Sequence, residues 1–464
     1  MLEVDFYNDK GRFLRSMYGE IELPDGASKI KIHGSGDNVN NGFQMLLNML
    51  KRYGGKINMV SLHDIQEISP EMLAFLVWIA SKTNGLEVYD CKLGDSGFAS
   101  LMSAVLQPNG LTKLELTIDN ESPRITKHQA TLLFEGVALS SSLKNLRIDA
   151  YFEDHDLNEI GPILLYTLRR NRSLKDLQLI TNCLGREGLI GSLIQAAVLQ
   201  TKVTDLHLEH ADDTEETISS ISLDTLADSV CRRDCSLRDL LLDNILLEPE
   251  SSAKSAAMEK NSSVICLNLL NVGIALPDAM PTIRLFDSLK DLVLMNCSIS
   301  DLTPLDEILL RGKESKLERL TLNGNDITEQ DLIIFLEKVP RMRCLKCLEL
   351  ADMTCLEVTE TCVAALKNAV WSSTSLESVY YNFESASLKQ LDSMIKVATT
   401  LNRGGQRKHL DCYPISLPQN LWSHVLKRAM TIKYYDDEDE WKLPTLTTPC
   451  FDAVYWLLST KMHF

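Results

Sequence analysis

Residues 288–340 read SLKDLVLMNCSISDLTPLDEILLRGKESKLERLTLNGNDITEQDLIIFLEKVP, and they contain one pattern of apolar residues twice. The first copy has Leu289, Leu292, Leu294, Cys297 and Ile299; the second has Leu317, Leu320, Leu322, Asn325 and Ile327. Alternating leucines predict a strand in each copy. A helix should follow, opened by Thr303-Pro304 in the first copy and by Thr328 with Asp331 in the second. Each unit is therefore a strand, a turn and a helix, and units must stack because none can bury its apolar face alone.

The pattern L-x-x-L-x-L-x-x-N/C-x-L resembles the leucine-rich repeat. Its leading position recurs roughly every 25 to 34 residues. The leading positions are Ile57, Thr83, Leu111, Leu143, Leu174, Val203, Leu237, Val264, Leu289, Leu317, Leu345 and Leu376. This spacing leaves room for a full helix in each repeat, so the chain resembles the long, ribonuclease-inhibitor-like class of repeat.

The resemblance implies an α/β fold: a curved leucine-rich-repeat solenoid (horseshoe) with parallel strands on the concave face and helices on the convex face. The curvature follows because strands stack about 4.8 Å apart and helices about 10 Å apart. We expect an N-terminal cap at 1–27, containing a hairpin turn near residues 8–11, and the solenoid at 28–400. A C-terminal helical cap should span 401–464, and its LNRGG…LWSHVLKRA…VYWLLS also resembles the end of intracellular leucine-rich-repeat proteins from single-celled algae. The acidic insertion at 209–216 should form a loop.

Composition excludes several classes of function. The net charge of −17 and the pI near 5.1 argue against a surface for nucleic acid or anionic membrane. No apolar run reaches the ~18 residues of a membrane span, and the first residues lack a secretory signal pattern. Because many of the 12 cysteines occupy core positions of the repeat, we expect reduced thiols in an intracellular, cytoplasmic protein. A mature secreted form without its signal is the alternative.

The motifs that could carry chemistry have structural explanations. Gly94-Asp95-Ser96-Gly97 lies where a strand turns into a helix, so its glycines are expected to shape the turn and Asp95 to cap the helix. Cys344 and Cys347 have the C-x-x-C spacing but straddle a strand and lack a second pair. Gly34-Ser35-Gly36 lacks the third glycine of a dinucleotide turn, and no phosphate-binding loop is present. We therefore expect no catalytic residues, no metal, no cofactor and no enzyme activity.

The expected concave face gives a stronger indication of function than these motifs. In each strand, the residue between the last two leucines and the residue after them should point away from the core. These pairs are Ser61/His63, Glu87/Tyr89, Glu115/Thr117, Arg147/Asp149, Gln178/Ile180, His207/Glu209, Leu241/Asp243, Asn268/Leu270, Val293/Met295, Thr321/Asn323, Glu349/Ala351 and Tyr380/Asn382. Most are polar, but Leu241, Leu270, Val293 and Met295 would expose aliphatic side chains on consecutive strands. With the polar neighbours Asp243, Asn268, Thr321 and Asn323, they form a candidate partner-binding surface. Alternatively, a loop, the C-terminal cap or a register error of one residue hides them.

The first functional expectation is a non-enzymatic scaffold that binds an unidentified protein partner on its concave strand face. The second is a regulator resembling the leucine-rich-repeat activators of the nuclear-transport GTPase, which share long repeats and a following acidic segment. Here the acidic run at 436–440 (DDEDE) is short and precedes an apolar segment, which departs from that family. The third is a structural subunit of a large assembly. The partner and the oligomeric state do not follow from the sequence.

Overall fold

The computed structural model describes most of the repeat region. The described residues are 2–6, 29–34, 57–65, 70–107, 110–119, 122–186, 188–199, 203–211, 219–232, 235–249, 263–273, 275–310, 315–353 and 359–382, with residues 395, 399 and 402. The chain divides into two compact units, Met1–Ile265 and Cys266–Phe464, and each is described by itself.

The first unit contains a sheet in which successive strands pair in parallel. Its strands, in sheet order, are β1 (Leu2–Phe6), β2 (Lys29–Gly34), β3 (Ile57–His63), β4 (Thr83–Tyr89), β5 (Lys113–Ile118), β6 (Asn145–Ala150), β7 (Asp176–Thr181), β8 (Asp205–His210) and β10 (Asp239–Asp243). Two further strands, β9 (Ser219–Ser222) and β11 (Ile245–Glu248), form a separate parallel pair. Strand order thus follows chain order, as stacked units require.

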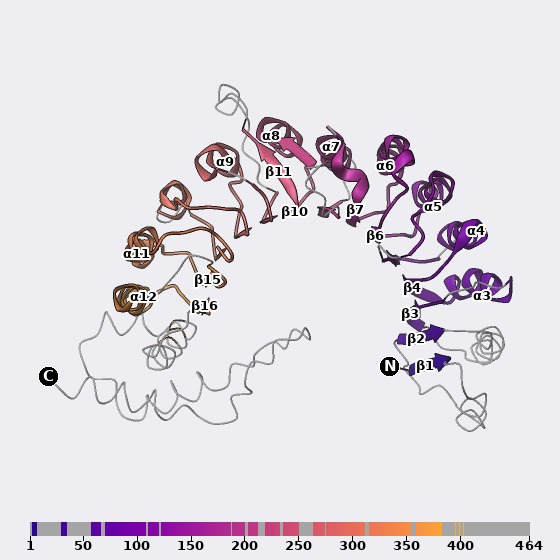
Figure 1. The fold of residues 1–464 in the computed structure, drawn as a ribbon, viewed down its shortest axis with the longest axis horizontal. Helices are drawn as coiled ribbons and strands as arrows, with labels where there is room; N and C mark the ends of the chain where they lie inside the picture. The colour runs from indigo at the N-terminus through magenta and orange to yellow at the C-terminus, as the bar shows by residue number, and fades with distance from the viewer. Residues whose placement is uncertain are drawn as a thin grey trace. The chain divides into compact units, whose positions relative to one another are not determined.

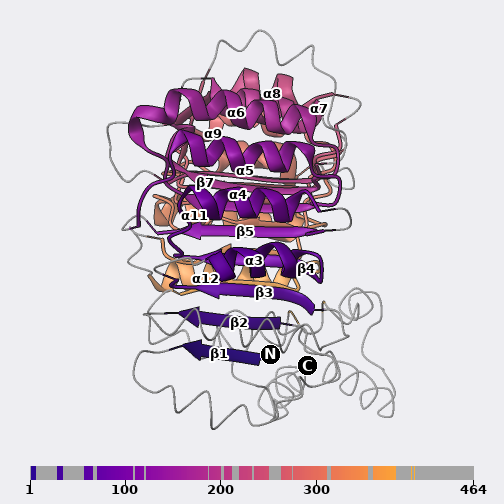
Figure 2. The ribbon, with the colours of Figure 1, turned by 90° about the vertical axis from the view of Figure 1, so that its right-hand side faces the viewer.

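Helices alternate with these strands and form a second layer (Figure 1). They are α3 (Pro70–Ala80), α4 (Gly94–Val105), α5 (Lys127–Leu139), α6 (Leu157–Arg170), α7 (Leu189–Leu199) and α8 (Leu223–Val230), with short 3₁₀ turns η1 (Asp154–Asp156) and η2 (Asn182–Gly185). Each helix packs against the next in the chain, and Figure 2 shows α3, α4 and α5 side by side in front of the strands. The described helices therefore cover one face of this sheet.

The second unit repeats the arrangement. Its parallel strands are β12 (Cys266–Leu270), β13 (Asp291–Met295), β14 (Arg319–Thr321), β15 (Cys347–Leu350) and β16 (Ser378–Tyr381). Its helices are α9 (Leu276–Ile283), α10 (Asp306–Leu309), α11 (Glu329–Lys338) and α12 (Glu360–Ser372), with 3₁₀ turns η4 (Thr303–Leu305) and η5 (Val339–Arg341). The α/β class and the alternation of strands with helices are confirmed.

The core lies between the two layers and follows the predicted repeat. Each leading position, from Ile57 to Leu376, is at most 6% exposed. The two alternating leucines of the strand are also buried, as Leu292 and Leu294 show at 0%. Strand register places equivalent positions opposite one another, with Leu292 beside Leu267 and Leu320. The recurring apolar positions therefore form a continuous spine within each unit.

Buried asparagines connect consecutive repeats through the backbone. Asn325 is fully buried, and its Oδ1 accepts hydrogen bonds from the backbone N–H groups of Cys297 (3.0 Å) and Ile299 (3.2 Å). Its Nδ2 donates to the carbonyl of Leu294 (2.7 Å), also in the preceding repeat. Asn182 similarly accepts from the N–H of Phe152 and donates to its carbonyl, each at 2.9 Å. These bonds satisfy polar backbone groups in loops that the stack buries.

A left-handed residue recurs after the strands, and the sequence reading overlooked it. Positive φ angles near 50–55° occur at Asp64, Asp90, Asn244, Asn271, Asn296 and Asp352. Asparagine and aspartate tolerate this conformation better than other residues with a side chain. The same step after β14 uses Gly324 at φ +69°, where a Cβ atom would lie 1.7 Å from Asn296 Oδ1. The available signal was an Asn, Asp or Gly two residues after the second apolar residue of seven strands; the equivalent residues of β5, β6, β7 and β8 are Ile118, Ala150, Thr181 and His210.

Local predictions had mixed outcomes. The Thr328 hydroxyl accepts from the N–H of Asp331 (3.2 Å), which confirms the predicted helix start. The helix after Thr303-Pro304 is only a 3₁₀ turn followed by the short α10. Residues 2–6 pair in parallel with β2, whereas the sequence suggested the arm of a hairpin; the turn at 8–11 lies outside the described residues. The insertion at 209–216 begins inside β8, and its residues 212–216 are likewise not described.

Candidate functional site on the open strand face

Side chains of the central strands alternate between two environments. Strands β5, β6, β8, β12 and β13 alternate half-buried and buried residues along their length. The buried residues face the helices, and the half-buried residues lie on the opposite face, which no described helix of the same unit covers (Figure 1). We call this surface the open strand face. In the first unit it comprises the positions in register with Lys113, Glu115 and Thr117, and in the second those in register with Asp291, Val293 and Met295.

The predicted partner-binding residues divide between the units. Leu241 and Asp243 lie half-buried on β10 of the first unit. The others belong to the second unit, where Asn268, Leu270, Val293, Met295 and Asn323 are half-buried. Asn323 Oδ1 accepts a hydrogen bond from the N–H of Ala351 (2.7 Å). The surface proposed below is therefore confined to the second unit.

Three aliphatic residues come together in the second unit. Register places Leu270 directly beside Met295, and Val293 lies two residues before Met295 on the same face of β13. Asn268 is the register partner of Val293 and supplies a polar edge. We call Leu270, Val293 and Met295 the apolar patch. Each side chain is half-buried, so each still presents apolar surface to solvent.

Thr321 differs from the expectation. It lies in register between Val293 and Glu349, yet it is only 4% exposed. Thr321 is therefore buried and offers little surface to a partner.

The open strand face of the first unit is charged rather than apolar. Lys113 Nζ lies 2.7 Å from Glu115 and 3.9 Å from Glu87, and the Tyr89 hydroxyl donates to Glu115 at 3.0 Å. Burial raises the pKa of Tyr89, and the carboxylates of Glu87 and Glu115 raise it further. The Ser61 hydroxyl donates to Glu87, so Ser61 is not paired with a histidine base. Lys113, Glu115 and Tyr89 thus pair with one another across β4 and β5.

Strands β6 and β8 each carry a further pair of a basic and an acidic side chain on this face. Arg147 lies 3.3 Å from Asp149, and His207 Nε2 lies 3.2 Å from Glu209. Burial raises the pKa of Asp149; Arg147 opposes the rise, and Glu209 adds to it. The carboxylate of Glu209 on β8 thus raises the pKa of Asp149 on β6.

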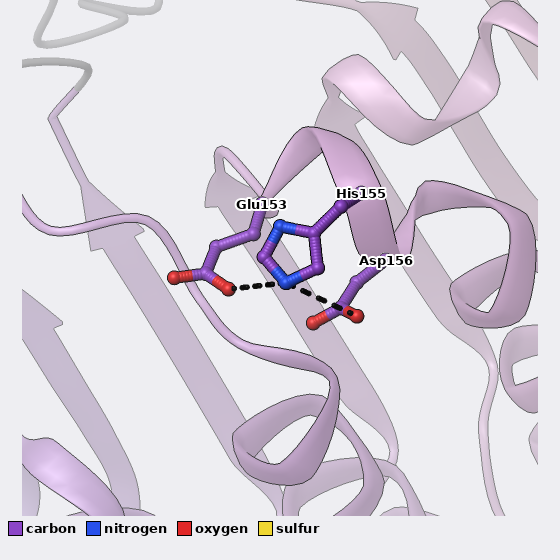
Figure 3. A group of neighbouring side chains, drawn as sticks. All are labelled: Glu153, His155 and Asp156. Atoms are coloured by element: carbon purple, nitrogen blue, oxygen red, sulfur yellow. Dashed lines mark ion pairs between the residues drawn. The ribbon is translucent and has the colours of Figure 1, made fainter.

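A group of potential metal ligands lies away from the strand face, at η1 (Figure 3). His155 Nε2 is 3.2 Å from a Glu153 oxygen and 3.6 Å from an Asp156 oxygen. The His155 side chain is 76% exposed, and Asp156 Oδ2 accepts a hydrogen bond from the N–H of Lys127 (2.6 Å), the first residue of α5. Asp156 therefore links two repeats. We assign no metal to this group, which the sequence reading overlooked although E-D-H-D is visible in the chain.

The two motifs that suggested chemistry have other roles. Gly94 adopts φ +55°, and Asp95 Oδ1 accepts from Gln129 Nε2 of α5 (2.9 Å). The helix-capping role expected for Asp95 is wrong, because α4 has no side-chain cap and Asp95 reaches the next repeat instead. In the C-x-x-C pair, both cysteines are free, and burial raises the pKa of Cys347 to about 11. A protonated thiol is a poor nucleophile and a poor metal ligand.

Comparison with known protein families finds no model that matches the chain, and comparison with curated proteins finds no similar sequence. Across the described residues, no helix has the length and apolar character needed to traverse a membrane.

Proposed function

We propose that the chain is a leucine-rich-repeat protein of the long, ribonuclease-inhibitor-like class, and that it binds a protein partner without catalysing a reaction. The observation that carries this proposal is the apolar patch on the open strand face of the second unit. Burying aliphatic surface contributes about 25 cal/mol per Å² to the free energy of binding. Three half-buried side chains therefore contribute part of the free energy of binding a partner, and not all of it. Protein interfaces have such an apolar centre with a polar rim.

The repeat geometry supports the proposed class. Most described repeats join a short parallel strand to a helix. In four of them a buried Cys or Asn stands at the consensus position after the strand, namely Cys91, Asn182, Cys297 and Asn325. Parallel strands are about 4.8 Å apart whereas helices need about 10 Å, so such repeats curve with their strands inside. A concave face of this kind fits a convex partner.

The double substitution Leu270→Glu with Met295→Glu tests the patch. Both side chains are half-buried on the strand face, so the chain should still fold, while two buried charges at an interface should abolish capture of the principal partner in a pull-down. Circular dichroism and thermal unfolding would verify that the variant is folded.

Ile334→Glu is the matched control. Ile334 lies on α11 of the same unit and is 39% exposed, so this substitution places one glutamate on the helix layer, where the double variant places two on the strand face. Partner capture should be unaffected by this substitution. If the control loses the partner and the double variant keeps it, the binding site lies on the helices and the proposal is wrong.

We further propose an intracellular, cytoplasmic location. Cys91 and Cys183 are free and buried in the spine, as in proteins of reducing compartments. Neither alternative function gains a supporting observation: the acidic run at 436–440, on which the resemblance to GTPase activators rests, lies outside the described residues.

A further inference from the structure

Aspartates occupy the same register position on three adjacent strands of the first unit. Asp176 on β7 lies opposite Asp205 on β8, which lies opposite Asp239 on β10. All three are half-buried on the open strand face. Neighbouring strands are about 4.8 Å apart, so the three carboxylates form a row of like charges.

Hydrogen bonds hold part of this row in place: Asn145 Nδ2 donates to Asp176 (3.1 Å), and the Thr204 hydroxyl donates to Asp205 (2.5 Å). Burial raises the pKa of Asp176; the amides of Asn145 and Gln178 oppose the rise, and Asp205 adds to it. Like charges on adjacent strands repel one another, so this face has a negative potential. A surface of one sign of charge attracts a partner of the opposite sign.

Two more carboxylates lie towards the ends of the same strands. Asp149 on β6, Ile180 on β7 and Glu209 on β8 are consecutive register partners. Ile180 is only 8% exposed, so the two carboxylates, and not the apolar side chain between them, are what this end of the face offers a partner. Carboxylates are the groups that the cationic ends of lysine and arginine side chains bind.

We propose that the open strand face of β6, β7, β8 and β10 binds a basic segment of a partner protein, rich in arginine and lysine. This inference rests on the proposed protein-binding function and specifies the chemistry of the partner. Charge complementarity selects this occupant: Asp149, Asp176, Asp205, Glu209, Asp239 and Asp243 are all on this face. Arg147 is the only Lys or Arg at the open-face positions of these strands. Nucleic acid and anionic lipid would be repelled by the same surface.

The test uses the full chain and a fluorescein-labelled twelve-residue peptide of alternating arginine and serine, with binding followed by fluorescence anisotropy. The double variant Asp176→Asn with Asp205→Asn keeps the shape of both side chains and removes two charges from the row. We expect it to bind the peptide about ten-fold more weakly at low salt. A peptide of alternating glutamate and serine should not bind.

The double variant Glu135→Gln with Asp228→Asn is the control. Both residues are exposed on the helices α5 and α8 of the same unit, so the net charge changes equally. Affinity within two-fold of the unaltered chain is expected here. Equal weakening by both variants would mean that the peptide follows net charge only, and no weakening by the strand-face variant would place the binding elsewhere; either result overturns the proposal.

The experiment separates this inference from the proposed function. Leu270→Glu with Met295→Glu lies in the second unit and should leave peptide affinity undiminished even though it abolishes capture of the partner. If the peptide binds as expected while the partner is retained by that variant, the apolar patch is wrong and the acidic strand face stands. If that variant loses the partner and the peptide does not bind to the unaltered chain, the apolar patch stands and the acidic strand face is wrong.

Discussion

Replacing Asn325 by alanine is expected to lower the free energy of unfolding by about 3–5 kcal/mol. Asn325 is fully buried, and its amide serves the backbone of two repeats. Without it, the N–H groups of Cys297 and Ile299 and the carbonyls of Leu294 and Leu322 lose partners at 2.7–3.2 Å. Each buried polar group left unsatisfied costs about 1–3 kcal/mol, less where the site relaxes or admits water.

Urea unfolding followed by circular dichroism would measure this loss. Asn323→Ala is the control, because Asn323 is half-buried and its side-chain oxygen accepts from the N–H of Ala351 in the next repeat. We expect the control to cost about 1 kcal/mol. If the two variants lose similar free energies of unfolding, the hydrogen bonds of Asn325 do not stabilise the packing of adjacent repeats more than that of Asn323.

Phe134→Ala is expected to destabilise the first unit by about 3–5 kcal/mol. Phe134 lies on α5 and is 0% exposed, and its ring centroid is 6.4 Å from that of Phe152, which precedes α6. Removing the ring leaves a cavity between two repeats rather than inside one. Because each repeat is stabilised mainly by its neighbours, the unfolding transition should also become less cooperative.

Leu139→Ala on the same helix is the matched control. Leu139 is 53% exposed, so truncation should change the free energy of unfolding by less than about 0.5 kcal/mol. Chemical denaturation monitored at two wavelengths would measure both the loss of free energy of unfolding and any broadening of the unfolding transition in Phe134→Ala. A loss below 1 kcal/mol for that variant would argue against an apolar spine shared between repeats.

The fold follows from the sequence because the repeat fixes register. A strand reverses its buried face if its register slips by one residue, so the alternation around Leu292 and Leu294 allowed only one orientation. Repetition then placed each strand beside the next. Details set by neighbouring repeats were not predictable from a single repeat: Asp95 binds Gln129 instead of capping its own helix, and Thr321 is buried.

The candidate site was predictable in part. The alternation that identified the spine also identified Leu270, Val293 and Met295 as residues of the opposite face, and the structure places them there half-buried. The aspartate row was missed because the residues expected on the open face began at Gln178, His207 and Leu241, each two residues after an aspartate. Its signal is the repeated D-L-x-L of DLQL, DLHL and DLLL, beginning at Asp176, Asp205 and Asp239. Only the parallel register shows that these aspartates lie side by side.

Hydroxyl-radical footprinting of the complex captured by the unaltered chain tests the central claim most directly, namely that the open strand face is the binding surface. Oxidation of Met295 and Leu270 should slow several-fold in the complex, because the partner covers the apolar patch. Oxidation of Ile334 and Trp371, which are exposed on α11 and α12, should not change. Protection of Ile334 and Trp371 with unchanged oxidation of Met295 and Leu270 would contradict the account.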